Sequence, residues 1–263
     1  MARKPTLSPS KITTYLACPV KYRWTYVDAR GKWYIRSKSY YSFGSTLHAV
    51  LQRFHDEQDK GVTTTHEAIA ALEESWIEAG YESQDEMMQA MAEGKSIVQA
   101  YVERHEREPV TAKTLMVEKL LRMDLGEFTL IGRLDRVDER EDGTIEVVDY
   151  KSGRQTVDAE DIKTDLAMSC YQLLLAQEYP GRNVAATIVA LRSGDKATYS
   201  MSQEELAAFR QDIEFIGNEI LDRDFENLSP VAKPLCLHCD FQSLCKKSEG
   251  FVDQLRAFEP AQA

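Results

Sequence analysis

Two apolar segments joined by a tight turn constrain the fold of this chain more than any other feature of its sequence. They read FTLIGRLDRVD (128–138) and IEVVDYKSG (145–153), with Asp142-Gly143 between them. An Asp-Gly pair flanked by alternating apolar residues is a strong signal for a β-hairpin turn. We therefore expect two antiparallel strands that bring Asp135 and Asp149 side by side.

Charged residues stand in these strands where burial is expected. Asp149 and Lys151 are two residues apart and therefore on one face of their strand. Asp135 shares a face with Ile131 and Val137, and a carboxylate there is costly unless a cation neutralises it. Two close carboxylates form the hard-oxygen site that Mg²⁺ or Mn²⁺ prefers, and a lysine in it suits a phosphate. The spacing leaves open an Asp149–Lys151 ion pair with Asp135 on the surface.

Apolar periodicity and turn residues outside this hairpin predict helices followed by strands. The predicted order is an N-terminal helix interrupted or bent at Pro19, three helices, a three-stranded meander, a helix, a strand pair and a long helix. This order predicts an α/β fold with a mixed central sheet flanked by helices. The later predicted helices are 42–59, 65–79, 84–107, 161–179 and 203–225, and the predicted strands are 114–124, 127–138, 144–151, 184–192 and 196–201.

Three thiols lie close together in the C-terminal tail PLCLHCDFQSLC, at Cys236, Cys239 and Cys245. Thiols clustered in this way bind one metal ion or cluster, which needs a fourth ligand. Cys18, in LACPVKY, and His238, within the tail, are the candidates, and thiol chemistry leaves both zinc and iron–sulfur open. Cys170 lies on the apolar side of a predicted helix and is expected to pack in the core.

The net charge of −11 argues superficially against a nucleic-acid partner, but the charge is unevenly distributed. Residues 1–40 hold nine Lys or Arg and one acid, a net charge of +8, whereas the remainder holds 23 basic and 42 acidic residues, a net charge of −19. A basic segment on an acidic body suits phosphate binding, and aromatic rings among the charges suit stacking on unpaired bases. The alternative is that the rings anchor a helix and the charges are solvated. The residues concerned are Arg3, Lys4, Lys11, Lys21, Arg23, Arg30, Lys32, Arg36 and Lys38, with Tyr15, Tyr22, Trp24, Tyr26, Trp33 and Tyr34.

No apolar run reaches the length of a membrane span, and the N-terminus MARKPTLSPS lacks the apolar segment of a signal peptide. We therefore expect a cytoplasmic protein without a membrane partner. In a reducing cytosol, the five cysteines favour metal binding or core packing over disulfides.

The motif GRLDRVD…EVVDYKSG resembles the core of the PD-(D/E)XK nuclease superfamily, specifically its RecB-like branch, in which G-x-x-D precedes an apolar strand that ends in D-Y-K-[ST]-G. The segment FGSTLHAVLQRFHD resembles the G-x-x-x-H segment of the same branch. The resemblance implies a restriction-endonuclease-like core and metal-assisted phosphodiester hydrolysis. It implies that Lys151 positions or activates the attacking water and that one or two divalent ions are bound by His48, Asp135, Asp149 and the backbone carbonyl of Tyr150.

Two further positions match this family less completely. Gln172 in SCYQLLLAQEY matches a family glutamine, which implies that it orients the water or the phosphate. Ala176 stands where many members have a tyrosine, so that Tyr171 or Tyr179 is a candidate replacement. Glu118 in MVEKLL matches a weaker family position and is either a supporting acid or a surface charge.

The segment SKITTYLACPVKY and the cysteine tail together resemble the iron–sulfur nucleases of the RecB-like branch. This resemblance implies a 4Fe-4S cluster that joins the N-terminal helix to the C-terminus and is held by Cys18, Cys236, Cys239 and Cys245. It also implies a single nuclease domain over 1–263, with a helical insertion at 60–110 and a cluster-binding tail at 230–250 paired with Cys18.

The sequence contains no G-x-x-x-x-G-K-[ST] phosphate loop, so no helicase motor is expected. The chain is similar to the CRISPR-associated RecB-like exonucleases. We expect a metal-dependent deoxyribonuclease acting on single-stranded DNA or DNA ends in repair, recombination or CRISPR adaptation, with an integrase or helicase as a candidate partner. The alternative is a non-catalytic DNA-binding or assembly module stabilised by iron–sulfur or zinc, which leaves the acid–acid–lysine set without a role.

Overall fold

A computed structural model describes residues 4–28, 31–56, 62–108, 111–153 and 156–259. They form two compact units: unit 1 comprises residues 1–9 and 37–214, and unit 2 comprises residues 10–36 and 215–263. This division does not test the predicted single nuclease domain over residues 1–263, which stays a prediction. Arg3 and Arg30 of the predicted basic segment lie outside the described residues, as do the ends of the predicted insertion at 60–61 and 109–110.

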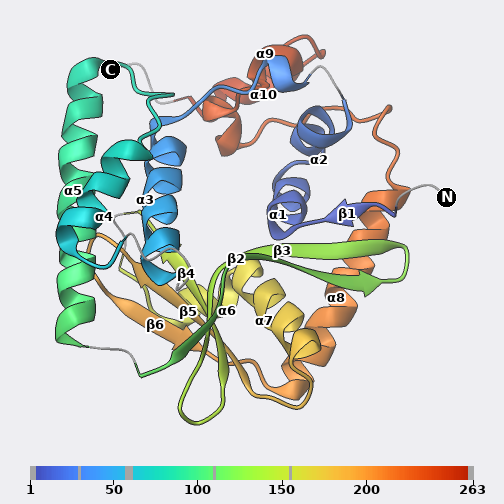
Figure 1. The fold of residues 1–263 in the computed structure, drawn as a ribbon. Helices are drawn as coiled ribbons and strands as arrows, with labels where there is room; N and C mark the ends of the chain where they lie inside the picture. Colours follow the sequence, from blue (N-terminus) through green and yellow to red (C-terminus); the bar gives the residue numbers. More distant parts are fainter. Residues whose placement is uncertain (1–3, 29–30, 57–61, 109–110, 154–155, 260–263) are drawn as a thin grey trace. The chain divides into compact units, whose positions relative to one another are not determined.

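Unit 1 is built on a mixed sheet of six strands in the order β1-β3-β4-β5-β6, with β2 paired to β3 (Figure 1). Strand β1 runs parallel to β3 and β4 runs parallel to β5, whereas the other pairs are antiparallel. The predicted α/β fold with a mixed, helix-flanked sheet is thus confirmed. The strands are β1 (Thr6–Leu7), β2 (Lys113–Leu125), β3 (Phe128–Glu139), β4 (Ile145–Lys151), β5 (Val184–Ala190) and β6 (Lys196–Tyr199).

The hairpin that joins β3 to β4 forms at the predicted Asp-Gly turn. Gly143 has a φ of 82°, in the left-handed region that favours glycine, and the side chain of Asp142 accepts a hydrogen bond from the Thr144 N–H at 2.8 Å. The antiparallel register places Val137 opposite Val147. This turn sets which residues of the two strands are neighbours.

Three helices pack on one face of the sheet: α3 (Ser39–His55), α4 (Thr65–Glu74) and α5 (Gln84–Arg107) (Figure 1). Their apolar side chains form a core cluster with Val148 and Tyr150 of β4 and Val189 of β5. Because side chains alternate along a strand, Asp149 and Lys151 point to the opposite face. Alternation therefore separates the core residues of β4 from its charged residues.

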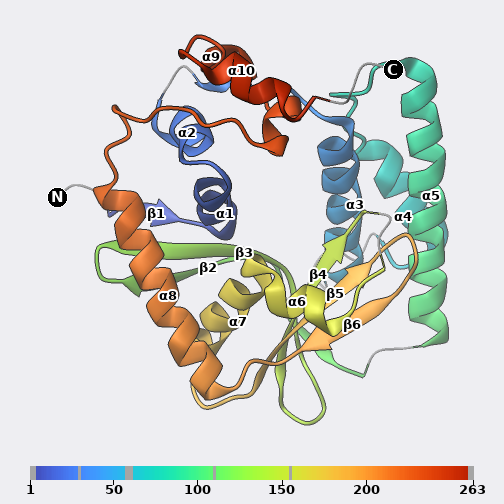
Figure 2. The same ribbon diagram turned by 180° about the vertical axis from the view of Figure 1, so that it is seen from behind.

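The opposite side of the sheet carries α7 (Leu166–Glu178), which contacts β2, β3, β4 and β5 and follows the short helix α6 (Ala159–Thr164) (Figure 2). The sequence predicts one helix at 161–179, but Asp165 divides it. The backbone of Asp165 is extended, and its side chain accepts hydrogen bonds from the N–H groups of Ala167 and Met168. A helix N-cap of this kind starts α7 afresh.

Unit 2 combines short helices from both ends of the chain. Pro19 divides the N-terminal helix, as predicted, and the Cys18 sulfur accepts a hydrogen bond from the Lys21 N–H at 3.4 Å at the start of the second part. The buried rings of Tyr15 and Tyr22 pack against Phe225. The elements are α1 (Pro9–Ala17), α2 (Pro19–Tyr22), η1 (Arg23–Val27), η2 (Gly31–Trp33), η3 (Pro234–His238), α9 (Gln242–Cys245) and α10 (Phe251–Arg256).

Helix α8 (Gln203–Asp222) contributes residues to both units. In the part of the chain that the structure describes, no helix has the length and apolar character needed to span a lipid bilayer.

Gly132 of the GRLD motif provides a test of this packing. A Cβ atom built there would lie 2.6 Å from Leu174 Cδ1 and 3.0 Å from the Tyr171 ring, both on α7. We expect Gly132→Ala to lower the free energy of unfolding by about 1–3 kcal/mol, because overpacking forces buried side chains to shift. Urea unfolding measures the change. Gly153→Ala is the matched control, because its Cβ meets no atom within 4 Å, and an equal loss in both variants would contradict the packing.

Candidate active site

A cavity of about 620 Å³ opens in unit 1 between α3 and the β2–β3 hairpin, and we call it the His48 cavity. Its volume lies in the range typical of ligand pockets. Its polar lining includes His48, Glu118, Arg133 and Asp135. The cavity therefore holds two of the residues that the sequence predicts to bind a metal ion.

Three potential ligand atoms converge in this cavity. One atom each of His48, Glu118 and Asp135 lies within 4.8 Å of the other two. His48 Nδ1 is 3.3 Å from Asp135 Oδ2 and 3.9 Å from Glu118 Oε1. The Asp135 side chain is only 13% exposed, so it is not a surface charge. An imidazole and two carboxylates at this spacing form a donor set that suits a divalent cation.

Glu118 enters the site through an unusual backbone conformation. Val117 pairs with Arg136 and Lys119 with Leu134, so Glu118 lies opposite Asp135 in the β2–β3 ladder. Its φ of 48° is the only positive φ of a non-glycine residue among the described residues. Such a conformation is uncommon for a residue other than glycine and costs about 1–3 kcal/mol. The sequence left the role of Glu118 open between supporting acid and surface charge, and the structure places it in the cavity.

Burial and the neighbouring Asp135 raise the pKa of Glu118, and Arg133 opposes this rise because its Nε lies 2.9 Å from Glu118 Oε2. The carboxylate is 15% exposed. The ion pair orients one oxygen of Glu118 and leaves the other directed at His48.

His48 connects the carboxylates to the end of β4. Its Nε2 lies 2.9 Å from the Tyr150 carbonyl oxygen and its Nδ1 faces Asp135. Both neighbours are acceptors for the protonated ring, whereas binding of a cation at Nδ1 requires the neutral ring, with the Nε2–H donating to the Tyr150 carbonyl oxygen. Burial lowers the pKa of His48, but the hydrogen bond to Asp135 and the negative charges around it outweigh burial and raise it to about 9. The ring thus contacts two groups that the sequence predicts to bind a cation.

Asp149 and Lys151 form an ion pair beside these groups, with Lys151 Nζ 2.8 Å from Asp149 Oδ2. Burial raises the pKa of Asp149 to about 6, and Asp135 adds to the rise while Lys151 opposes it. Burial lowers the pKa of Lys151, but Asp149 outweighs this and raises it overall. Lys151 is therefore an ammonium group at neutral pH, which suits the binding of a phosphate oxygen rather than the removal of a proton.

Tyr171 and Gln172 are consecutive residues of α7 with different surroundings. Burial and then the charges of Asp149 and Asp135 raise the pKa of Tyr171. The Gln172 side chain is buried, and its Oε1 accepts a hydrogen bond from the Met201 N–H at 2.8 Å. Its Nε2 has no hydrogen-bond partner among the described residues. The predicted role of Gln172 stays a prediction.

Tyr179, the other candidate of the sequence, interacts with a different set of charges. Its pKa is raised by burial and by Glu178 and Glu139. Of the two tyrosines, Tyr171 is therefore the one that interacts with the predicted catalytic carboxylates.

A buried polar network on the helical side of the sheet fixes Tyr150, and the sequence analysis missed it. Arg136 Nη1 donates to the Tyr150 hydroxyl at 2.7 Å and to the Tyr101 hydroxyl at 3.2 Å, and its Nη2 lies 3.0 Å from Asp138. His55 packs against this network, and burial and Arg136 lower its pKa to about 2, so it is neutral. The signal in the sequence is the presence of Arg136 and Asp138 on the same strand face as the apolar Leu130 and Leu134.

Four thiols line a second, small pocket that lies within unit 2. They come from Cys18 near the N-terminus and from Cys236, Cys239 and Cys245 in the tail. Burial and the three other thiols raise the pKa of Cys245 to about 12. His238, the alternative fourth ligand, does not line this pocket, and Cys170 is buried in α7 of unit 1.

The sulfur atoms of the thiol pocket lie farther apart than those of a closed tetrahedral zinc site. No three of its sulfur atoms form a group within 4.8 Å of one another among the described residues, whereas Zn–S bonds of about 2.3 Å place tetrahedral thiolates less than about 4 Å apart. The free space between them is about 10 Å³, roughly the room that a water molecule needs. The donor set suits a four-thiolate metal centre.

The His48 cavity predicts a divalent cation site that can be measured without any substrate. We expect Asp135→Asn to weaken Mn²⁺ binding at least about tenfold, because a ligand charge is lost, while the amide oxygen can still accept the hydrogen bond that the Tyr150 N–H donates to Asp135 Oδ2. Electron paramagnetic resonance of free Mn²⁺ measures the affinity. Asp124→Asn, which removes an exposed carboxylate paired with Lys4, is the matched control. Equal affinity in all three proteins would exclude this site.

Comparisons with known proteins bear on the family of this chain. Residues 6–246 match the sequence model of the PD-(D/E)XK nuclease superfamily. A search among curated proteins finds no match. Similar solved structures include that of SSO0001, with 11% identity, a TM-score of 0.36 and coverage of 94% of this chain and 88% of that chain. Another is a candidate exonuclease from Eubacterium rectale, with 11% identity, a TM-score of 0.39 and coverage of 82% of this chain and 93% of that chain.

At these TM-scores, neither solved structure supports a statement about substrate or activity. The match to the sequence model, by contrast, spans most of the chain and includes every residue of the His48 cavity and its neighbouring ion pair. The chain therefore belongs to the PD-(D/E)XK nuclease superfamily.

Proposed function

We propose that this protein is a metal-dependent deoxyribonuclease that cleaves single-stranded DNA or DNA ends, with exonuclease activity. The observation that supports this most is the convergence of His48, Glu118 and Asp135 in one cavity, with the Asp149–Lys151 pair close enough to Asp135 to interact with its charge. Membership in a nuclease superfamily supports the same conclusion.

The residues of the His48 cavity fit Mg²⁺ or Mn²⁺. Three carboxylates, an imidazole and the Tyr150 carbonyl provide mostly hard ligands. Asp149 Oδ2 is buried and forms an ion pair with Lys151, but it accepts no hydrogen bond from a described residue. This oxygen can therefore still bind a cation. We assign His48, Asp135, Asp149 and the Tyr150 carbonyl as ligands, with Glu118 as a supporting acid. A bound divalent ion supplies charge neutralisation of the phosphate and activation of a water molecule.

Lys151 and α7 complete the proposed site. The ammonium group of Lys151 binds a non-bridging oxygen of the scissile phosphate and stabilises the charge that develops there. Asp149 holds this ammonium group in place through the ion pair at 2.8 Å. We assign the orientation of the attacking water or the phosphate to Gln172. Tyr171 is a second candidate for this role, because burial and the charges of the carboxylates raise the pKa of its hydroxyl.

The DNA-binding surface that we propose lies on the basic N-terminal segment of unit 2. Tyr15 and Tyr22 are buried there, which supports the anchoring interpretation for these two rings. The rings of Trp33, 77% exposed, and Tyr26, 41% exposed, are available for stacking on bases. Lys32 Nζ lies 5.2 Å from the Trp33 ring centroid, so charge and aromatic surface coincide. Affinity for DNA therefore falls steeply as salt rises.

For the thiol pocket we propose a 4Fe-4S cluster held by its four cysteines. The convergence of Cys18 with three thiols of the tail supports a four-thiolate centre. The N–H groups of Lys21 and Lys233 each donate to a sulfur at 3.4 Å, to Cys18 and Cys236 respectively, and such hydrogen bonds stabilise thiolate ligands. Zinc is the alternative occupant. Either centre ties the two ends of the chain together within unit 2.

The chain has no helicase motif of its own, so we propose that it acts on free ends or is delivered by an integrase or helicase in repair, recombination or CRISPR adaptation. The Asp149–Lys151 ion pair, in which only the aspartate is buried, also suits a purely structural role. A non-catalytic DNA-binding or assembly module is therefore the second candidate.

The nuclease proposal is tested with end-labelled single-stranded DNA and Mn²⁺. We expect Lys151→Ala to reduce the cleavage rate by about 100-fold or more, the usual consequence of losing one group that stabilises transition-state charge. Lys163→Ala, at an exposed lysine of α6 in the same unit, is the matched control and keeps the wild-type rate. Circular dichroism verifies that both variants are folded.

Two outcomes contradict the nuclease proposal. Cleavage at the wild-type rate by folded Lys151→Ala would show that Lys151 has no role in the mechanism. Absence of cleavage by metal-loaded wild type on single-stranded, duplex and flapped DNA supports the assembly module instead.

The cluster proposal is tested by metal analysis of protein purified without oxygen. We expect brown wild-type protein with about four iron atoms per chain, loss of colour and iron in Cys236→Ala, and no change in Cys170→Ala. The last variant is the matched control, because Cys170 is buried in unit 1 and does not line the thiol pocket. A colourless wild type with stoichiometric zinc would replace the cluster by a zinc site.

A further inference from the structure

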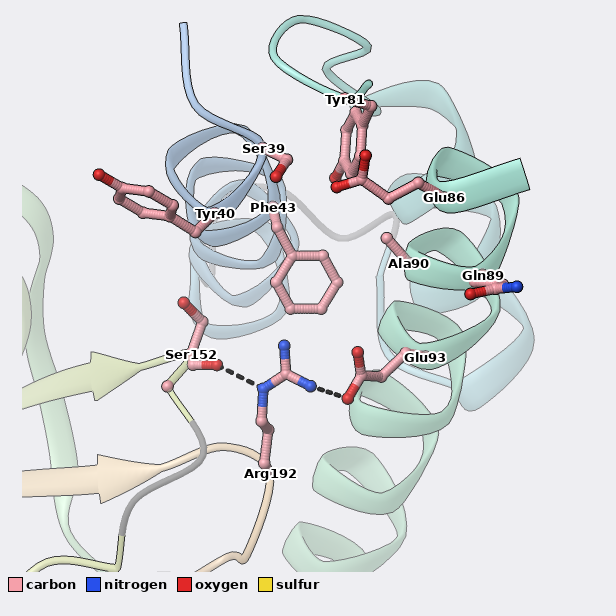
Figure 3. A pocket seen from close by; sticks show the side chains of 11 residues that line it. Ser39, Tyr40, Phe43, Tyr81, Glu86, Gln89, Ala90, Glu93, Ser152 and Arg192 are labelled. Atoms are coloured by element: carbon pink, nitrogen blue, oxygen red, sulfur yellow. Dashed lines mark hydrogen bonds and ion pairs between the residues drawn. The ribbon is translucent and has the colours of Figure 1, made fainter. Parts of the chain in front are cut away.

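A second cavity of about 540 Å³ lies in unit 1, and we call it the Tyr81 pocket (Figure 3). Its walls come from α3, from the N-terminal half of α5 and from the loop before it, and its floor comes from the ends of β4 and β5. Its aromatic and charged lining consists of Tyr40, Phe43, Tyr81, Glu86, Glu93 and Arg192. None of them belongs to the predicted metal site.

The Tyr81 pocket adjoins the His48 cavity. Tyr40 and Ser152 line both, and Ser152 directly follows Lys151 at the end of β4. The Arg192 Nε donates a hydrogen bond to the Ser152 carbonyl at 2.6 Å, which fixes the boundary between the two cavities. A DNA strand whose phosphate lies in the His48 cavity therefore has its neighbouring nucleotide at the entrance of the Tyr81 pocket.

The charges in the Tyr81 pocket exclude a phosphate as its occupant. The Arg192 guanidinium is ion-paired with Glu93, as Figure 3 shows, and stacks on the Phe43 ring at 4.9 Å. Glu86 adds a second carboxylate to the lining. With its cation already neutralised and a further acid present, the pocket repels an anion and suits a neutral group with hydrogen-bond donors.

The polar atoms of the pocket suit a nucleobase. The Tyr81 hydroxyl is buried and has no hydrogen-bond partner among the described residues, although it lines the cavity close to Glu86 (Figure 3). Such a group costs free energy unless a ligand or water satisfies it. One Glu86 oxygen accepts from the Glu82 N–H at 2.7 Å, which orients the carboxylate. The ring of Tyr40, 61% exposed at the shared rim, offers a stacking surface.

We propose that the Tyr81 pocket receives an unpaired base of the DNA strand next to the cleaved phosphodiester bond and favours cytosine or adenine over thymine. The inference rests on the proposed nuclease function. The Glu86 carboxylate accepts a hydrogen bond from the exocyclic amino group of cytosine or adenine, while the Tyr81 hydroxyl bonds the adjacent ring edge. Thymine presents a carbonyl oxygen at the position of the amino group, which the carboxylate repels.

The test measures the binding of short oligodeoxycytidylate and oligodeoxythymidylate of equal length by fluorescence anisotropy in EDTA, so that no cleavage occurs. We expect wild type to bind the cytidylate about fivefold more tightly, the value of one good polar base contact, and Tyr81→Phe and Glu86→Gln to lose this preference. Tyr81→Phe removes a hydroxyl that no described residue bonds, so the fold is retained. The amide oxygen introduced by Glu86→Gln can still accept from the Glu82 N–H. Asp85→Asn, which removes an exposed charge one residue away on α5, is the matched control and keeps the preference.

Cleavage mapping on single-stranded DNA of mixed sequence then places the contact. We expect the same preference at one position beside the cut, reduced in both variants and kept in Asp85→Asn. Equal binding of the two oligonucleotides by wild type, or a preference unchanged in Tyr81→Phe and Glu86→Gln, overturns the base pocket even if the enzyme cleaves DNA. Absence of cleavage with a preference that the variants abolish overturns the nuclease function and leaves the base pocket in place.

Discussion

Tyr150 is the residue on which the geometry of the candidate site depends, because it connects both faces of the sheet. Its N–H donates to Asp135 at 2.9 Å and its carbonyl oxygen lies 2.9 Å from His48 Nε2. On the opposite face, its hydroxyl is held by Arg136 at 2.7 Å within a buried network. Buried hydrogen bonds of this kind restrict the position of the Tyr150 side chain, although Arg136 Nε has no hydrogen-bond partner among the described residues. The rigid core thus positions the backbone atoms that His48 and Asp135 contact.

The carboxylates of the site are each compensated by one cation, which explains how a buried acidic cluster is tolerated. The pairs are Glu118 with Arg133, Asp149 with Lys151 and Asp135 with His48. The raised pKa values of Glu118 and Asp149 show that this compensation is incomplete, since burial still disfavours their charged forms. Burial of these incompletely compensated charges lowers stability, as is common at functional sites. The left-handed backbone of Glu118 is a second cost of the same kind.

The sequence predicts the parts of the site that depend on local rules and misses those that depend on tertiary packing. The Asp-Gly turn and strand alternation suffice to bring Asp135 towards Asp149 and to orient Lys151. The φ of Glu118 follows from no local pattern. The orientation of α7, and with it the position of Tyr171, depends on how Asp165 restarts the helix. The sequence analysis did not detect the Tyr81 pocket, because its walls and floor come from separate segments that range from Ser39 to Arg192.

Two glycines allow elements that are distant in the sequence to approach each other closely around the site. A Cβ atom at Gly44 of α3 would lie 3.1 Å from Ser152 Oγ, and one at Gly132 of β3 would lie 2.6 Å from Leu174 Cδ1 of α7. Both glycines belong to the segments that resemble family motifs, FGSTLH and GRLD. Their contribution is distance rather than chemistry: a Cβ atom at Gly132 would force α7 side chains to shift, whereas one at Gly44 would require the Ser152 hydroxyl to give way by only a few tenths of an ångström.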